Sequence, residues 1–178
     1  MKRFKKIFFV GLICAIISIV YYYNFSLSSF LHGYGFSTKN IILSEEVTQK
    51  DGPLVKVLLV TDGENLGVLT AKRNKFWMWS NFATGTYLSS PSSHEYASAI
   101  VVTNNDLPFG EKRAFDHHIF VATFLEDKSA ISVPSPDDFF LNVQFFEIKG
   151  KTLLYAQAKN SKEKPELIPN DVIKLFNN

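Results

Sequence analysis

An unbroken apolar segment begins at residue 7, and the pattern changes to a two-residue period beyond residue 40. Residues 7–23, IFFVGLICAIISIVYYY, carry no charged side chain. At about 1.5 Å per residue, a helix of this length spans about 25 Å, close to the hydrocarbon thickness of about 30 Å in a bilayer. Beyond residue 40 apolar and polar side chains alternate over short runs, which is typical of β-strands. The pattern predicts a transmembrane helix followed by a β-rich domain.

Seven segments of that domain have strand patterns bounded by turn residues. Asp62-Gly63 favours a tight hairpin after the first strand, and Lys149-Gly150 turns the sixth strand into the seventh. No connection is long enough to hold a clear crossover helix, so we expect antiparallel pairing. The expected strands are residues 54–60, 67–72, 76–80, 96–103, 118–125, 139–148 and 151–159.

A short helix is expected after Pro169, with Asn170 or Asp171 as its N-cap. Its apolar side consists of Val172, Ile173, Leu175 and Phe176. The longest loop signal is at residues 81–95, where serines surround a proline. The fold class is therefore mainly β (α+β): a transmembrane helix, then one antiparallel domain of about seven strands with a short C-terminal helix.

Charge is placed unevenly along the chain. Lys2, Arg3, Lys5 and Lys6 are followed by no charged residue before Lys39, and the positive-inside rule puts that basic end in the cytoplasm. The whole chain has 19 basic and 17 acidic residues, so removing those four leaves 15 basic against 17 acidic. Such a domain lacks the basic field that nucleic-acid binding requires, which excludes that class of partner.

Four segments follow from these observations. They are a basic cytoplasmic tail, a transmembrane anchor, a juxtamembrane linker and an extracytoplasmic β-rich domain, at residues 1–6, 7–23, 24–40 and 41–178. A cleaved signal peptide is one alternative, but its nearest small-x-small site, at 26–28, lies beyond three tyrosines. A buried helix of a soluble protein is the other. We favour an uncleaved single-pass anchor held in the lipid bilayer, and we expect the chain from about Lys39 onward to fold without it.

The stretch KRNKFWMWSNF, residues 72–82, holds both tryptophans of the chain. Trp77 and Trp79 are two apart, so they share one face of a strand, and Phe76 and Met78 share the other. We favour the interpretation that a Lys/Arg turn leads into a mostly buried strand. One face of that strand packs in the core, which we expect to be the Trp face, and the other covers a neighbouring sheet or the membrane-proximal surface. The alternative is an exposed aromatic platform for a sugar ring or a partner protein.

The cluster Asp116-His117-His118 is the only one with ligand chemistry. His117 and His118 are adjacent, so on a strand they point to opposite faces and cannot both bind one ion. A zinc site would need help from His94 and Glu95. We favour a polar strand start, and expect no metal and no cofactor.

Motifs for catalysis are missing from the sequence. The single cysteine, Cys14, lies in the apolar run, so the domain can form no disulfide and no Cys-ligated metal site. No Gly-x-Ser-x-Gly motif and no phosphate-binding loop occur. Asp137-Asp138 could be a carboxylate pair, but a turn role is favoured. No catalytic residue is assigned, and the possible partner-binding residues are Trp77, Trp79, His117 and His118.

The order of these features resembles a loose group of uncharacterised, membrane-anchored proteins of Firmicutes. In that group a strand-turn-strand unit opens a small β-rich outer domain. The residues that carry the resemblance are Asp62, Gly63, Lys72, Arg73, Trp77 and Trp79, and it covers roughly residues 45–160. It implies an outer location and a fold type, and it carries over no catalytic residue.

Two classes of function remain open. The first is a non-enzymatic, extracytoplasmic binding or interaction module for a protein partner, cell-wall material or a small ligand. The second is a cell-surface, hydrolase-like enzyme that uses Asp116, His117 or His118. An exposed Trp patch without a deep pocket would favour the first, whereas a pocket that brings His94 close to either histidine of the pair would favour the second.

Overall fold

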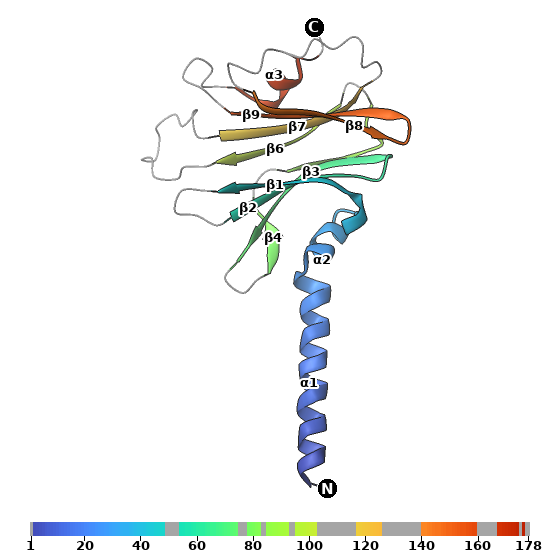
Figure 1. Ribbon diagram of the computed structural model, residues 1–178, viewed down its shortest axis with the longest axis vertical. Coiled ribbons are helices and arrows are strands. Elements are labelled where there is room, and N and C mark those ends of the chain that lie inside the picture. Colours follow the sequence, from blue (N-terminus) through green and yellow to red (C-terminus); the bar gives the residue numbers. More distant parts are fainter. Residues whose placement is uncertain are drawn as a thin grey trace, which may run out of the picture.

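A computed structural model describes residues 2–48, 54–74, 78–82, 85–92, 95–102, 117–125, 140–159, 167–174 and 176. Two antiparallel β-sheets are stacked above a long N-terminal helix, and a short helix near the C-terminus lies on the far side of the stack (Figure 1). The predicted fold class, a mainly β antiparallel domain with these two helices, is confirmed.

The N-terminal helices are α1 (Lys2–Phe25) and α2 (Leu27–His32), followed by the 3-10 helix η1 (Thr38–Asn40). The strands are β1 (Ile41–Thr48), β2 (Leu54–Thr61), β3 (Asn65–Arg73), β4 (Trp79–Asn81), β5 (Thr86–Ser89), β6 (Ala97–Val102), β7 (His117–Leu125), β8 (Phe140–Ile148) and β9 (Lys151–Lys159). Helix α3 (Pro169–Lys174) follows.

Two of these strands, β1 and β5, lack a clear signal in the sequence. β1 carries three consecutive polar residues, Ser44 to Glu46, and β5 has four residues inside the segment whose serines and proline indicated a loop. Both pair with a strand that the sequence pattern predicts, β1 with β2 and β5 with β3. Their backbone pairs with a neighbour although their own side chains give only a weak alternation.

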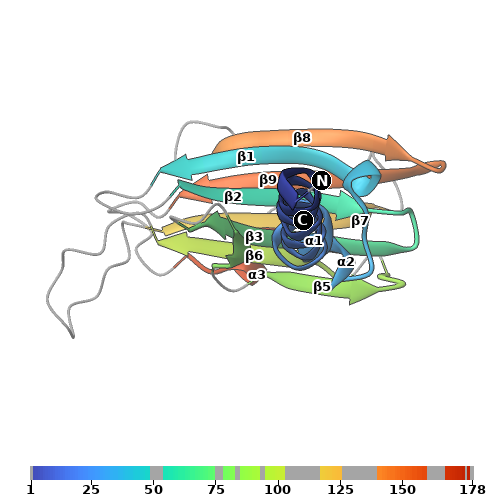
Figure 2. The same ribbon diagram turned by 90° about the horizontal axis from the view of Figure 1, so that it is seen from below.

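Sheet A has the order β1-β2-β3-β4, and β5 also pairs with β3. β3 holds both partners because its first half pairs with β5 and its last residues pair with β4. Sheet B has the order β6-β7-β9-β8. Seen from below, the strands of the two sheets run roughly along one direction (Figure 2). The domain is thus an aligned β-sandwich.

The main core lies between the two sheets. Val57 and Leu59 from sheet A meet Phe120, Ala122 and similar side chains from sheet B, all almost completely buried. Alternation along a strand sends the intervening side chains to the outside of the sandwich. On β7 these are Ile119 and Val121, which pack under α3 with Val172, Ile173 and Phe176. Helix α3 therefore covers the outer face of sheet B.

Part of the outer face of sheet A is covered by the segment expected as a linker. Leu31 from α2 and Phe36 from the following loop are buried against Leu58, Val60 and Leu69. The N-terminus of α2 is capped by Ser26, whose Oγ accepts a hydrogen bond from the Ser29 N–H at 3.1 Å. The linker is consequently a packed element that ties α1 to the sandwich.

The two sheets are joined differently at their two edges. On one edge Gly85 pairs with Ala99, and the Thr86 hydroxyl donates to the Ser98 carbonyl at 3.1 Å, so β5 connects sheet A to β6. On the other edge β1 and β8 lie on the same side of the molecule (Figure 2). There the link between sheets is made by the side chain of Glu45, as described below.

Candidate functional site

Helix α1 projects from the sandwich and touches little of it (Figure 1). Within the described residues it is the one helix long and apolar enough to cross a membrane, over Lys6–Tyr23, and none of that window is buried. The side chains of Ile7, Phe8 and Phe9 are more than half exposed. So much exposed apolar surface is unfavourable in water and favourable in an apolar medium. This exposure favours bilayer contact through residues 7–23, which stays a prediction.

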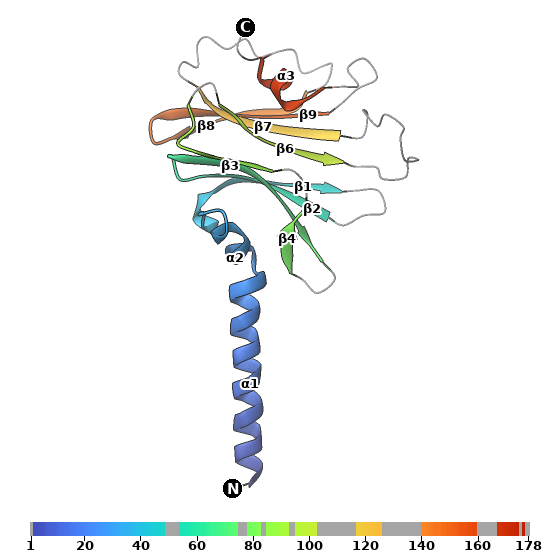
Figure 3. The same ribbon diagram turned by 180° about the vertical axis from the view of Figure 1, so that it is seen from behind.

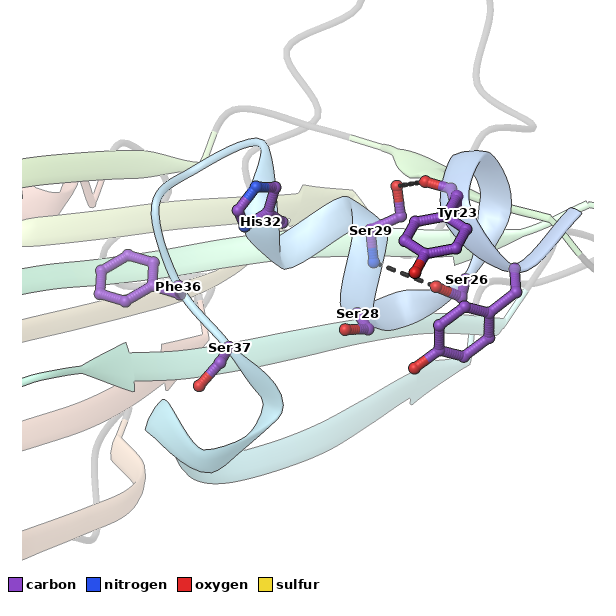
Figure 4. A pocket seen from close by; sticks show the side chains of 8 residues that line it. Tyr23, Ser26, Ser28, Ser29, His32, Phe36 and Ser37 are labelled. Carbon is purple, nitrogen blue, oxygen red and sulfur yellow. Dashed lines mark hydrogen bonds between the residues drawn. The ribbon is translucent and has the colours of Figure 1, made fainter. Parts of the chain in front are cut away.

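A half-open cavity of about 370 Å³ lies where α1 meets α2 (Figure 4). The Ser29 hydroxyl donates to the Tyr23 carbonyl at the junction, which ties α2 to the end of α1. The lining side chains offer hydroxyl groups, aromatic rings and one imidazole, and the described ones include no carboxylate, Lys or Arg. They are Tyr22, Tyr23, Ser26, Ser28, Ser29, His32, Phe36 and Ser37.

The part of the outer face of sheet A beyond α2 carries a basic and aromatic surface. We call it the Trp79 patch and define it as Leu54, Lys56, Arg73 and Trp79. On β2 the outward side chains include Leu54 and Lys56, because Val55 and Val57 face the core. On β3 Arg73 lies in register with Trp79 of β4, so both side chains point to the same outer face.

Trp79 lies at the centre of this patch. The Lys56 Nζ is 5.7 Å from the centroid of its ring, and the Arg73 Cζ is 5.8 Å away. Cations at this distance are attracted to the negative face of the indole, by about 0.5–1 kcal/mol each at exposed positions. Lys56 also pairs with Glu46 at 3.1 Å. Two cations therefore lie near the ring, and Leu54 adds an apolar side chain to the same surface.

The interpretation that the Trp face packs in the core is wrong for Trp79. Its side chain is half-buried and belongs to none of the three buried clusters. The register of the β3–β4 hairpin decides this, because pairing with Arg73 turns Trp79 away from sheet B. The hairpin is closed by the Met78 N–H, which donates to the Asn74 Oδ1 at 3.1 Å. Trp77 lies outside the described residues.

The two histidines are not brought together. His118 is in line with Phe120 on the inner side of β7, with ring centroids 6.3 Å apart, and its Nδ1 is 3.4 Å from the Gln157 Nε2. His117 is in line with Ile119 on the opposite face. Burial and the nearby charge of Lys159 lower the pKa of His118 below its ordinary value.

A metal centre at this pair would need further ligands. Asp116 and His94 lie outside the described residues, as does Asp137-Asp138, and Glu95 has its side chain engaged with the Ser92 N–H at 3.0 Å. Across the part of the chain that the structure describes, no three His, Cys, Asp or Glu side chains gather in a group that could hold a metal ion.

Asp62 and Gly63, which carry part of the resemblance, form a structural turn. Burial alone would raise the pKa of Asp62, but hydrogen bonds from Asn65 and Glu64 outweigh it and lower the pKa. Gly63 has φ of +91°, and a Cβ there would lie 2.5 Å from the Lys149 Cδ. Its role is to fit the β2–β3 turn against the β8–β9 turn.

One partly buried polar contact between the sheets has no counterpart in the sequence analysis. The Glu45 Oε1 accepts a hydrogen bond from the Asn142 Nδ2 at 3.3 Å. Burial, the charge of Glu45 and a hydrogen bond with its carboxylate raise the pKa of Tyr155 far above its ordinary value. The Tyr155 hydroxyl therefore stays protonated. A glutamate at an inward position of β1 is the signal that could reveal this contact, but the sequence pattern does not identify β1 as a strand.

Comparison with protein-family models, with curated proteins and with solved structures finds no match for this chain.

Proposed function

We propose that this is a single-pass protein of the cell membrane, with a cytoplasmic N-terminus, that displays a non-enzymatic binding module on the extracytoplasmic side. The observation that carries the proposal is the packing of α2 and Phe36 on sheet A, directly after an exposed apolar helix. A module joined in this way is held next to the bilayer. The basic residues before α1 support the orientation. The resemblance to membrane-anchored Firmicutes proteins implies the same location and stays a prediction.

The surface we assign to binding is the Trp79 patch. Tryptophan and arginine are among the residues most enriched at interface hot spots, and here Arg73 lies 5.8 Å from the Trp79 ring on an outer sheet face. The alternative, a hydrolase-like enzyme using Asp116, His117 or His118, gains no support from the described residues. His117 and His118 point to opposite faces of β7, so they cannot act on one substrate atom together.

Protease protection in cells tests the location and orientation. Intact protoplasts that express the chain with a C-terminal epitope tag are treated with a protease, and a cytoplasmic protein serves as the control for lysis. We expect the tag to be lost while the control protein stays intact. If the tag is lost only after lysis, the domain faces the cytoplasm and the proposal is wrong. If a tag at the N-terminus is absent from the mature protein, the segment is cleaved and the anchor is wrong.

A further inference from the structure

We propose that the Trp79 patch docks on the anionic headgroups of the same bilayer that α1 crosses. This inference rests on the proposed function, because it requires α1 to lie in a membrane. It names anionic lipid headgroups as the ligand of the Trp79 patch. The patch would be a second point of attachment, beside the helix. It would fix how the sandwich is tilted over the membrane.

The Trp79 patch lies on the outer face of sheet A. The outer face of sheet A is the face that α2 covers in part, and α1 leaves the domain from that face (Figures 1 and 3). β4 lies below the sheet on the same side as α1, and α2 contacts β4. When α1 crosses a bilayer, the Trp79 patch therefore faces the surface of that bilayer.

The side chains of the patch have the chemistry of a membrane interface. Trp at the headgroup level of membranes is common because its ring is amphipathic, and Tyr21, Tyr22 and Tyr23 occupy that level at the end of α1. Leu54 is 43% exposed on the patch, although a large apolar side chain is unfavourable in water. At a membrane surface, anionic headgroups lie next to the apolar hydrocarbon core. The patch matches both, because it carries an aromatic ring, an apolar side chain and two cations on one face.

Two side chains of the patch are cationic. Lys56 and Arg73 each carry a positive charge, and an ion pair places the acidic Glu46 beside Lys56. The Lys56–Glu46 pair is partly solvated, with 28% and 51% of the two side chains exposed. Such pairs contribute little to stability, so Lys56 can exchange Glu46 for a phosphate at small cost. Removal of the Glu46 charge should then strengthen docking.

The connection to α1 through α2 also favours docking. A free domain with two cations and one Trp would bind a membrane weakly. The packed connection through α2 keeps the patch close to the bilayer, so docking is an intramolecular step with a high effective concentration. A weak surface is sufficient when it is attached in this way.

Fluorescence quenching of the full chain in lipid nanodiscs tests the proposal. Trp77→Phe leaves Trp79 as the single tryptophan, since the chain has two. Discs consist of phosphatidylcholine with or without phosphatidylglycerol, and a lipid with a nitroxide on its headgroup is the quencher. We expect Trp79 to be quenched by the labelled lipid and shielded from aqueous iodide, and both effects to increase with phosphatidylglycerol.

Single substitutions then separate docking from a structural role. Lys56→Gln and Arg73→Gln should each lower the ratio of docked to undocked protein about fivefold. Glu46→Gln should raise it. The matched control is Lys151→Gln, which removes a cation 5.4 Å from the Phe124 ring on sheet B and should change nothing. Circular dichroism checks that each variant is folded. If a charge variant does not fold, the comparison of the two lipid compositions with the Trp77→Phe protein alone still tests docking.

Equal iodide access to Trp79 in discs and in detergent would overturn the proposal. Shielding from iodide without quenching by the labelled lipid would also overturn it, because the ring would then contact protein, such as a second copy of the chain. Lipid quenching that does not change with the phosphatidylglycerol content or with the charge substitutions would overturn the assignment to anionic headgroups. Nanodiscs have no inside or outside, so these results do not depend on the cellular orientation that protease protection tests.

Discussion

At the scale of single residues, register decides which chemistry a side chain can perform. His118 and His117 are neighbours in the sequence, yet one faces the sandwich interior and the other faces the α3 side. Trp79 is an aromatic residue in an apolar stretch, yet its pairing with Arg73 turns it outward. In both cases the identity of the residue suggested a role, and the direction of its Cβ determined which role is available.

The environment of His118 predicts a loss of stability in mild acid. Its folded-state pKa is lowered, mainly by burial and then by Lys159, below the value of 6.5 expected in the unfolded chain. As the pH falls through that value, the unfolded state binds a proton first, so the free energy of unfolding decreases until the folded-state pKa is reached. Above that value both states are neutral and His118 adds no pH dependence.

His118→Gln should remove this contribution. Denaturation midpoints measured from about pH 8 to about pH 5 should fall less steeply for the variant than for the wild type. Ile119→Val is the control, since it leaves both histidines in place and should retain the wild-type slope. Identical slopes for His118→Gln and the wild type would show that another group causes the acid dependence.

At the scale of elements, the segment between α1 and β1 is the part that sequence patterns describe least well. Its uncharged composition indicated a linker on the outer interface, but Leu31 and Phe36 are buried on sheet A. α2 has six residues, too short for a helical period to be recognised. The outer side of Leu58, Val60 and Leu69 needs a cover, and only the folded chain shows that this segment provides it.

We expect a chain that begins at Lys39 to be less stable than one that begins at Ser26. The longer chain keeps α2 and Phe36, which is 3% exposed, and the shorter one leaves Leu58 and Leu69 open to water. Phe36→Ala in the longer chain should cost about 3–5 kcal/mol, the usual range for a buried Phe. Chemical denaturation of the three proteins measures this. Equal midpoints for the two chain lengths would mean that the domain folds without the segment, as the sequence alone suggested.

At the scale of the whole molecule, the sandwich is closed by backbone pairing on one edge and by side chains on the other. Gly85 and Thr86 join sheet A to β6, whereas Glu45 of β1 reaches Asn142 and Tyr155 of sheet B. A carboxylate at the rim of a core is stable there because it accepts hydrogen bonds. The same charge on an edge strand also discourages pairing with another chain.

Tyr155→Phe and Glu45→Gln test that edge. Hydrogen bonds to charged groups contribute about 1.5–3 kcal/mol, so Tyr155→Phe should lower the free energy of unfolding by an amount in that range. The double variant should cost less than the sum of the two single ones, because both remove the same bond. Tyr96→Phe, in the cluster under α3, is the control for the loss of a hydroxyl. Additive costs in the denaturation cycle would exclude a direct link between Glu45 and Tyr155.

The sequence by itself determined the apolar helix and the antiparallel β class. It also located the Asp62-Gly63 and Lys149-Gly150 turns. These features depend on local period and turn chemistry, which short stretches of chain contain. The tertiary structure alone decided that β1 and β5 are strands, that the linker covers sheet A and that Trp79 faces outward beside Lys56 and Arg73. Each of these depends on a partner distant in the chain, and no local pattern specifies which strand lies beside which or which face remains uncovered.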